Sequence, residues 1–241
     1  MKQSKGIPVH IALILDGNGR WAQKRNLPRS EGHRQGGENL KKLIDEIFKL
    51  KIPYISLYTF STENWKRPKK EIFTLWKLMK EFFYLYLQEC IEKKICIKVS
   101  GDISKLPKEN QQIIADAVFK TRKNKNLLVN FCINYGSHHE IVHAVNQIFT
   151  EKLEFYKKHG FFKKITEKEI EKHLYTYPLP PVDLLIRPGG EHRISNFLLW
   201  QLAYAEIYFT DVLWPDFSKE DLLKALDWFS KRERRFGGLG N

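Results

Sequence analysis

Residues 9–21 read VHIALILDGNGRW, and this stretch places an apolar run directly before a polar loop. Its first seven residues are almost continuously apolar, which is typical of a strand buried on both faces of a parallel sheet. The segment Asp16 to Trp21 then carries a carboxylate, two glycines and an arginine. Because ligands of open α/β sheets bind beyond the carboxyl ends of the strands, the sequence predicts a ligand site after this first strand.

Apolar and amphipathic segments alternate along the rest of the chain. Further strands are predicted over 54–60, 95–100, 127–133, 182–186 and 206–209. Helices are predicted over 36–50, 71–93, 108–123, 138–158, 166–174 and 218–235, the last with Ser218 as its N-cap. This order predicts one doubly wound α/β domain over residues 1–241, with a mostly parallel central sheet of about six strands flanked by helices.

The predicted helix 71–93 is more apolar than a surface helix requires. Projected at ~100° per residue, its polar positions occupy a sector of roughly 120°, whereas a surface helix needs an apolar stripe only a little over ~100° wide. Those polar positions are Thr74, Lys77, Lys80, Glu81 and Gln88. Two interpretations stay open: the helix is buried between the sheet and a neighbouring helix, or part of its surface lines an apolar cavity.

Composition limits the class of protein. Hydrophobic residues make up 42% of the chain and aromatic residues 13%, which excludes an extended disordered chain. No apolar run approaches the ~18 residues of a membrane span, and no signal peptide is predicted at the N-terminus. The three cysteines, Cys90, Cys96 and Cys132, share no metal-ligand spacing. We expect them to be reduced packing residues of a cytoplasmic protein.

The formal net charge of +13 indicates a phosphate-rich partner, or lysines that merely decorate solvated faces. Lysine accounts for 30 of the 41 basic residues and is scattered, whereas eight of the 11 arginines are grouped in loops and at the C-terminus. Arginine presents a planar fork that suits phosphate. A nucleic-acid-binding protein is the alternative, but no recognised binding module occurs and the loop arginines are separated. The grouped arginines are Arg20, Arg29, Arg67, Arg187, Arg193, Arg232, Arg234 and Arg235.

Three predicted strand ends carry arginine together with a carboxylate or an amide. The second strand runs into FSTENWKRP at 60–68, and DLLIRPGGEHRISN occupies 183–196. Asp16 is suited to Mg²⁺, which takes one or two carboxylates plus water and phosphate oxygens. Taken alone, DGNGR is equally an Asn-Gly turn, and Trp21 and Trp65 are equally loop-packing residues. The convergence of three such loops favours a ligand site.

These segments resemble the motifs of bacterial undecaprenyl diphosphate synthases, in the cis-prenyltransferase family. The resemblance rests on HIALILDGNGRWA, GH at 32–33, SLYTFSTENWKRP and DLLIRPGGEHRISNFLLWQLAYAEIYFTDVLWPDF through RERRFGG, and it runs from about residue 8 to residue 238. One departure is YGSHHE at 135–140, where the family commonly reads YGGR followed two residues later by an acid. It puts the local loop shape in doubt, and we expect His138 and His139 to start a helix and not to bind metal.

The resemblance implies a fold with a hydrophobic tunnel and a Mg²⁺-dependent condensation of isopentenyl diphosphate with an allylic diphosphate, expected to be farnesyl diphosphate. The product would be a long-chain polyprenyl diphosphate such as undecaprenyl diphosphate, a precursor of the carrier lipid for cell-wall glycans. The resemblance also implies a homodimer in the cytoplasm that associates transiently with the inner face of the membrane. No nucleic-acid partner is expected. As a separate hypothesis, one face of the apolar helix lines this tunnel, and substitution of Leu78, Phe82 or Leu85 should shift product length at some of these positions and only lower stability at the others.

The resemblance also assigns roles to residues. Asp16 and Asn64 would be catalytic, Asn64 by orienting groups since a neutral amide is a poor base. The implied metal ligands are Asp16, Glu206 and His192. The residues implied at the phosphates of the allylic substrate are Gly17, Asn18, Gly19, Arg20, Arg29 and His33, with Trp21 nearby. Those implied for isopentenyl diphosphate are Arg187, Arg193, Ile194 and Ser195. Those implied around the reacting carbons are Ser61, Thr62, Glu63, Trp65 and Arg67, and Glu71 would help to place their loop.

Two expectations concern assembly. Arg235 and Gly237, near the C-terminus, would complete the diphosphate pocket of the neighbouring subunit. The alternative to an enzyme is a non-catalytic subunit of a prenyltransferase complex. Such a subunit would lack the metal carboxylate or the active-site arginine and asparagine, whereas Asp16, Asn64, Arg67, Arg187 and Glu206 are all present. The starter chain and the product length stay open.

Overall fold

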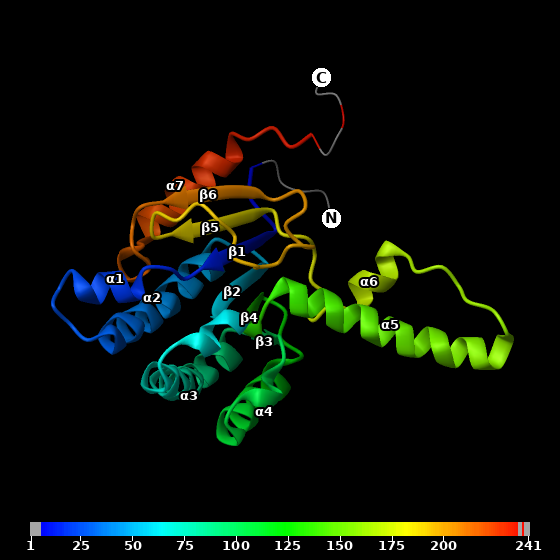
Figure 1. Cartoon of the computed structure of the whole chain (residues 1–241). Helices are drawn as coiled ribbons and strands as arrows, with labels where there is room; N and C mark the ends of the chain where they lie inside the picture. The colour runs from blue at the N-terminus through cyan, green and yellow to red at the C-terminus, as the bar shows by residue number, and fades with distance from the viewer. Residues whose placement is uncertain (1–5, 236–237, 239–241) are drawn as a thin grey trace.

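The structure is a computed structural model that describes residues 6–235 and residue 238 (Figure 1). Its centre is a six-stranded sheet in the order β3-β4-β2-β1-β5-β6, and every pairing in it is parallel. The strands are β1 (His10–Ile14), β2 (Tyr54–Ser61), β3 (Ile95–Ser100), β4 (Leu127–Tyr135), β5 (Leu184–Pro188) and β6 (Glu206–Thr210). The predicted α/β class and six strands are confirmed, with a wholly parallel sheet in place of a mostly parallel one.

The first strand lies at the middle of the sheet. It pairs with β2 on one side and with β5 on the other, so the strand order reverses beside it. All five residues of β1 are buried, as are those of β5, which agrees with the predicted strand covered on both faces. A reversal of strand order opens a crevice at the carboxyl edge, where loops from neighbouring strands diverge.

Helices cover one face of the sheet. The described helices are α1 (Asn18–Gln23), α2 (Arg29–Lys49), α3 (Lys69–Glu92), α4 (Lys108–Thr121), α5 (Ser137–His159), α6 (Glu167–His173) and α7 (Lys219–Ser230). Apolar residues of α2, α3, α4 and α7 pack on this face in the larger core. The other face is covered by a smaller core that includes Phe197, Leu198 and Leu202, from the irregular segment between β5 and β6. None of the described helices is long and apolar enough to cross a membrane.

Two helix boundaries differ from the prediction. Helix α2 begins at Arg29, directly after Pro28, and not at residue 36. Residues 29–33 of this turn-rich segment are therefore helical, and Arg29 and His33 lie one turn apart. Helix α7 begins after the predicted cap Ser218, whose hydroxyl accepts a hydrogen bond from the Asp221 amide at 3.3 Å, but it ends at Ser230. Its last buried side chain is Phe229, so the arginines beyond it have no apolar anchor that would extend the helix.

Helix α5 projects from the body of the molecule (Figure 1). Its buried residues are Ser137, Glu140, Ala144 and Ile148, which all lie in its first half. The chain then turns and returns through a loop to α6, which packs against α5. The far end of α5 is thus an arm that contributes nothing to the two cores.

Candidate functional site

A cavity of about 840 Å³ opens where the loops after β1, β2 and β5 meet α2 and α3. Three predicted loops therefore converge on one site at the carboxyl edge of the sheet. The polar residues and glycines that line it are Asp16, Gly17, Asn18, Gly19, Arg20, Arg29, His33, Gly36, Gly37, Thr59, Ser61, Glu63, Asn64, Arg67, Arg187, Arg193, Ser195 and Asn196.

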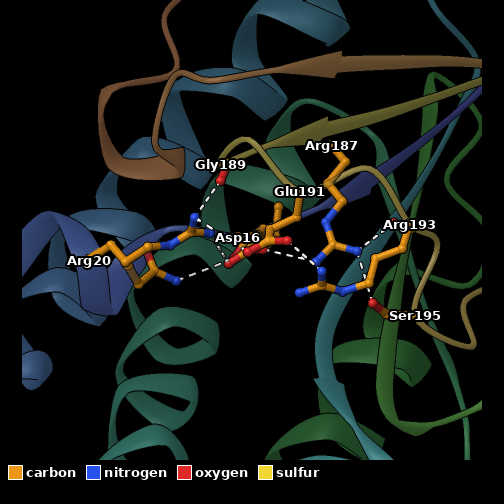
Figure 2. Close-up of polar contacts among 9 residues, drawn as sticks. Asp16, Arg20, Arg187, Gly189, Glu191, Arg193 and Ser195 are labelled. Atoms are coloured by element: carbon orange, nitrogen blue, oxygen red, sulfur yellow. Dashed lines mark hydrogen bonds and ion pairs between the residues drawn. The ribbon is translucent and has the colours of Figure 1, made fainter.

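Asp16 lies between two arginines (Figure 2). One carboxylate oxygen pairs with Arg20 Nη2 at 3.0 Å, and the other accepts a hydrogen bond from Arg187 Nη2 at 2.9 Å. Arg20 also donates to the Gly189 carbonyl at 2.5 Å. The loop after β5 is thereby tied to the loop after β1, although 171 residues separate Asp16 from Arg187.

Arg187 is the fixed member of this cluster. Its side chain is only 5% exposed, and it donates to Ser195 Oγ at 2.9 Å and to the carbonyl of Arg193. Its Nε is buried and has no hydrogen-bond partner within the described residues. A buried donor without a partner costs free energy, so this atom indicates a place where an acceptor binds.

A second basic cluster surrounds Glu71, whose side chain is 12% exposed. Glu71 pairs with Arg29 at 3.3 Å, with Arg67 at 3.1 Å and with His33 Nε2 at 3.2 Å. Burial opposes ionisation of Glu71, but the hydrogen bond from His33 and the charges of Arg29 and Arg67 outweigh it and lower its pKa. Burial lowers the pKa of His33 as well, despite the hydrogen bond with Glu71. The cluster therefore keeps an excess of positive charge from its two arginines.

Glycines permit the close approach of these arginines. A Cβ on Gly19 would lie 2.7 Å from the guanidinium carbon of Arg29, and one on Gly189 would lie 2.9 Å from Arg20 Nη2. Gly17 caps α1 with φ of 116°, and a Cβ there would meet Leu213 at 3.0 Å. The glycines predicted at the ligand loop thus make room for arginine side chains and for the backbone packed beneath them.

Asn64 faces the cavity from the short 3-10 helix η1 (Thr62–Lys66). Its side-chain oxygen accepts a hydrogen bond from the Ser61 amide at 3.1 Å and closes a capping box. The neighbouring Glu63 accepts a hydrogen bond from Asn196 at 3.0 Å, which ties this loop to the one after β5. Since its oxygen is committed to the backbone, the Asn64 amide has a fixed orientation.

Four predicted substrate-binding residues support the loops without lining the cavity. Trp21 Nε1 donates to Asp216 at 2.7 Å, and Trp65 Nε1 donates to Asn134 at 2.7 Å. The Thr62 hydroxyl lies against Gly136, where an added Cβ would be 2.6 Å away. Ile194 packs on the smaller core. For both tryptophans, packing in a loop was left open as the alternative to substrate binding, and their positions in the structure agree with packing.

An apolar region continues the cavity inward from the arginines. Leu75, Leu78, Met79, Phe82 and Phe83 of α3 line it, with Leu40, Phe131 and Ile133 opposite. A smaller void of about 30 Å³ shares Phe82, Phe83 and Phe131 with it. The cavity interpretation of the over-apolar helix is therefore confirmed, including Leu78 and Phe82. Leu85, the third position considered, is 64% exposed and does not line the cavity.

Several residues that line the cavity were not predicted from the sequence. Leu75, Met79 and Phe83 follow the spacing i, i+4 and i+8, which places them on one side of a helix together with Phe82. That spacing was available in the sequence. Phe131 and Ile133 are alternate residues of β4 and face the same side of the sheet, but only the strand order shows that this side meets α3.

The three predicted metal ligands do not meet within this chain. Asp16 follows the end of β1, whereas Glu206 begins β6 opposite Leu184, which itself pairs with Ile11. Glu206 is thus five residues back along the sheet from Asp16, roughly 16 Å. His192 stacks on Phe209 at 4.8 Å, and the described residues contain no group of three potential ligands. Asp16 and Glu206 therefore do not share a site within one chain, because they lie toward opposite ends of parallel strands.

The C-terminal arginines lie near the amino ends of the strands. Arg232 pairs with Glu206 at 3.8 Å, and Arg234 pairs with Asp183, which also accepts a hydrogen bond from the Val9 amide at 2.8 Å. Arg235 pairs with Glu233 at 2.6 Å. None of these described arginines lines the cavity beside Asp16. Gly237 lies outside the described residues.

The departure at 135–140 is accommodated by hydrogen bonds. His138 and His139 lie in the first turn of α5, as predicted. Ser137 accepts a hydrogen bond from the Leu199 amide at 2.7 Å, and the buried Glu140 accepts from Gln201 at 3.0 Å. The segment therefore supports the loop that carries Ser195 and Asn196.

Comparison with known proteins gives consistent matches. The family model described as "Putative undecaprenyl diphosphate synthase" matches residues 14–237. A curated protein of Leptospira interrogans named isoprenyl transferase is 52% identical over 98% of this chain and 97% of its own length. The isoprenyl transferase of Oceanobacillus iheyensis is 47% identical over 97% of this chain and 91% of its own length.

Two solved structures share the fold. The lavandulyl diphosphate synthase of Lavandula x intermedia, solved with dimethylallyl diphosphate, superposes with a TM-score of 0.90 at 34% identity, covering 97% of this chain and 100% of that one. A probable undecaprenyl diphosphate synthase of Campylobacter jejuni gives a TM-score of 0.78 at 32% identity, covering 98% and 100%.

Proposed function

The chain belongs to the undecaprenyl diphosphate synthase family of prenyltransferases, and we propose that it condenses isopentenyl diphosphate with an allylic diphosphate in a Mg²⁺-dependent reaction. The observation that carries the proposal is the shape and chemistry of the cavity. Arginines surround its mouth, and apolar side chains of α3 and β4 line its interior. Such a cavity suits a ligand with a diphosphate head and a hydrocarbon tail.

The residues at the mouth form two groups that would bind two diphosphates. Arg187, Arg193 and Ser195 would bind one, and the loop of Asp16 to Arg20 with Arg29 and His33 would bind the other. Arginine forks bind phosphate oxygens in pairs, and the Nε of Arg187, which has no hydrogen-bond partner among the described residues, supplies a further donor. The plant relative solved with dimethylallyl diphosphate supports a diphosphate ligand in this fold.

The residues fit Mg²⁺ through a single carboxylate. Asp16 would hold the ion at the mouth, because its side chain is 28% exposed and its partner Arg20, which is 42% exposed, can move to a diphosphate. Mg²⁺ commonly takes one or two carboxylates and completes its shell with water and phosphate oxygens. When bound, the ion would neutralise charge that develops on the departing diphosphate.

The chemistry asks the protein to stabilise charge and to fix geometry. The allylic C–O bond breaks, a C–C bond forms to isopentenyl diphosphate, and a proton leaves the product carbon. Arg20, Arg29 and His33 would stabilise the charge on the departing diphosphate. Asn64 would orient groups at the reacting carbons, since its oxygen is already engaged with the Ser61 amide. A diphosphate oxygen would accept the proton.

We propose a homodimer that completes each site. Glu206 and the C-terminal arginines lie at the amino end of the sheet, away from Asp16 of the same chain. They could reach an arginine-lined mouth only on a second copy. Arg235 and Gly237 would bind diphosphate there, and Glu206 would join its metal region.

We propose farnesyl diphosphate as starter and a long-chain product such as undecaprenyl diphosphate, for cell-wall glycan assembly in the cytoplasm or at the inner face of the membrane. The family to which the chain belongs and the apolar interior of the cavity support this choice. A non-catalytic subunit is less well supported, because Asp16, Asn64, Arg67 and Arg187 meet at one cavity.

The test is incorporation of labelled isopentenyl diphosphate with farnesyl diphosphate and Mg²⁺, followed by chromatography of the lipids. We expect a ladder that ends in a long-chain polyprenyl diphosphate and disappears on addition of EDTA. Absence of any lengthened product with allylic starters of several lengths would contradict the proposal. A short product would contradict only the proposed chain length.

A further inference from the structure

The far end of α5 and the turn after it form an exposed aromatic and basic surface. We call residues 155–165, which read FYKKHGFFKKI, the arm tip. Phe161 is 54% exposed, Phe162 is 57% exposed and Ile165 is 51% exposed. Large apolar side chains gathered in this way on a projecting arm are uncommon on a surface that meets only water.

The rings of the arm tip hold one another in place. Phe162 stacks on Tyr156 with centroids 4.5 Å apart, and Phe161 meets Phe155 edge-to-face at 5.4 Å. Lys163 Nζ lies 4.4 Å from the Phe155 ring centre. The two adjacent phenylalanines are therefore supported from below and keep their outer surfaces exposed.

The charge of the arm tip has one sign. Its eleven residues include four lysines and a histidine but no aspartate or glutamate. Lys157 pairs with Glu154 at 2.7 Å on the preceding turn. Among the described side chains, no carboxylate pairs with Lys158, Lys163 or Lys164. The surface thus combines exposed rings with unneutralised ammonium groups.

The arm tip is separate from the candidate active site. No residue of α5 lines the cavity, and Figure 1 shows the arm extending away from α1 and the loop that carries Asp16. Its side chains are also outside both cores. A role in folding or in catalysis does not account for this surface.

We propose that the arm tip docks the protein on an anionic lipid bilayer. Aromatic rings partition into the interface between headgroups and acyl chains, and nearby lysines are attracted to anionic lipid. The absence of carboxylates removes the repulsion that such a surface would otherwise exert. The inference deepens the proposed function, because an enzyme that makes a polyprenyl lipid has to deliver it to a membrane, but the binding itself requires no catalysis.

The test is co-sedimentation of the full chain with vesicles of phosphatidylglycerol and phosphatidylcholine, against vesicles of phosphatidylcholine alone. The parent should bind the anionic vesicles, and binding should weaken in 0.5 M salt by about tenfold or more. Replacing Phe161 and Phe162 together by Ser should lower the partition coefficient at least about tenfold, since two half-exposed rings no longer enter the interface. Phe119→Ser is the matched control, because Phe119 is 62% exposed beside Arg122 but stands alone on α4.

Charge is tested by a second matched pair. Lys163→Glu with Lys164→Glu should weaken binding at least about tenfold, whereas Lys123→Glu with Lys125→Glu, which changes net charge equally, should weaken it by about threefold or less. Equal losses from both pairs would show that net charge alone drives binding and would overturn the proposal. The proposal would also be overturned if the double Phe variant bound anionic vesicles as tightly as the parent does. It would likewise be overturned if the parent did not bind anionic vesicles.

Two further readouts separate the alternatives. Light scattering should give the same molecular mass for parent and arm-tip variants; a lower mass would assign the tip to contact between copies and overturn the proposal. Turnover of short-chain substrates in solution should stay parental in the arm-tip variants. If no form of the protein turned over substrate while vesicle binding followed the pattern above, the proposed function would fail and the membrane surface would stand.

Discussion

Asp16 is held by two arginines that differ in what surrounds them. Arg20 is 42% exposed, whereas Arg187 is 5% exposed. An exposed guanidinium is screened by water and can move to a ligand, while a buried one holds its partners where the fold puts them. At the residue scale, Arg187 therefore organises the mouth of the cavity and Arg20 is the arginine free to follow a diphosphate.

Arg187→Ala should lower kcat/KM for isopentenyl diphosphate by about 100-fold or more, since it removes charge-assisted donors to the substrate and leaves Asp16 with one partner. Arg187→Lys keeps the positive charge but loses the planar guanidinium fork, so its kcat/KM should lie between those of the parent and Arg187→Ala. Arg25→Ala is the control, because Arg25 pairs with Asp216 outside the cavity. Steady-state kinetics that showed equal losses for Arg187→Ala and Arg25→Ala would contradict the assignment.

His10 offers a test of stability that is independent of the site. Its ring nitrogens hydrogen-bond to Ser56 Oγ at 2.9 Å and to the Pro180 carbonyl at 2.8 Å, and burial lowers its pKa to about 4. The unfolded chain takes up this proton near pH 6.5, whereas the folded chain does so only near pH 4. Between these values the unfolded state binds more protons, so stability falls as pH falls.

The parent should therefore lose about 1.5 kcal/mol of unfolding free energy between pH 6.5 and pH 5 through His10. Urea unfolding at the two pH values measures this loss of unfolding free energy. His10→Gln should be less stable at pH 7 but should lose correspondingly less over the same interval. An identical loss in both proteins would show that His10 does not titrate as a buried neutral ring.

Local chemistry explains which site residues could be predicted. Arg20, Arg67 and Arg187 were predicted because arginine beside glycine or proline at a strand end is a local signal. The separation of Glu206 from Asp16 within one chain could not be predicted, because it depends on the direction and register of β6 in the sheet. The role of Glu71 as the centre of a basic cluster needed the start of α2 at Arg29, which the sequence placed seven residues too late.

At the scale of elements, α3 has two surfaces with different tasks. Leu78 and Phe82 face the cavity, whereas Leu85 is 64% exposed. The hydrophobic pattern predicted an unusually apolar helix, but it could not orient the helix because apolar side chains occupy both surfaces. Only the packing of α3 against β4 and α2 fixes which residues are lining.

Phe82→Ala should lengthen or broaden the product distribution, because Phe82 separates the main cavity from the smaller void behind it. The substitution should also lower the free energy of unfolding by about 3–5 kcal/mol if the space left by the ring stays empty, and by less where product fills that space. Leu85→Ala is the matched control on the exposed surface and should leave the distribution unchanged. Chromatography of labelled products is the measurement. An unchanged distribution in Phe82→Ala would contradict the prediction that α3 determines the length of the product.

At the scale of the whole molecule, the sheet separates two groups of charged residues. Asp16 and Arg187 lie beyond the carboxyl ends of the strands, and Glu206, Arg232 and Arg234 lie near the amino ends. Parallel strands make this separation unavoidable in one chain. The proposed second copy would unite the two groups. In the sequence this expectation came from the family resemblance alone, since local patterns of residues do not show how copies associate.

Complementation between two inactive chains tests this assembly. One chain carries Asp16→Ala with an intact C-terminus, and the other has a native site but ends at Arg234, which keeps the anchor on Asp183. If the C-terminus acts across the interface, co-refolding should restore at most about a quarter of parental activity, because half of randomly paired dimers are mixed and each has one complete site. A mixture that stays inactive would place the C-terminus in its own chain's site.

The whole molecule brings three strand-end loops to one carboxylate, so the direct test is turnover of Asp16→Ala. Incorporation of labelled isopentenyl diphosphate into farnesyl diphosphate should fall by at least about 100-fold, since one electrostatic contact at developing charge commonly contributes that much. Circular dichroism should show that the fold is retained, because Asp16 is partly exposed and lies outside both cores. An Asp16→Ala protein with near-parental turnover and the parental dependence on Mg²⁺ would contradict prenyl transfer at this site.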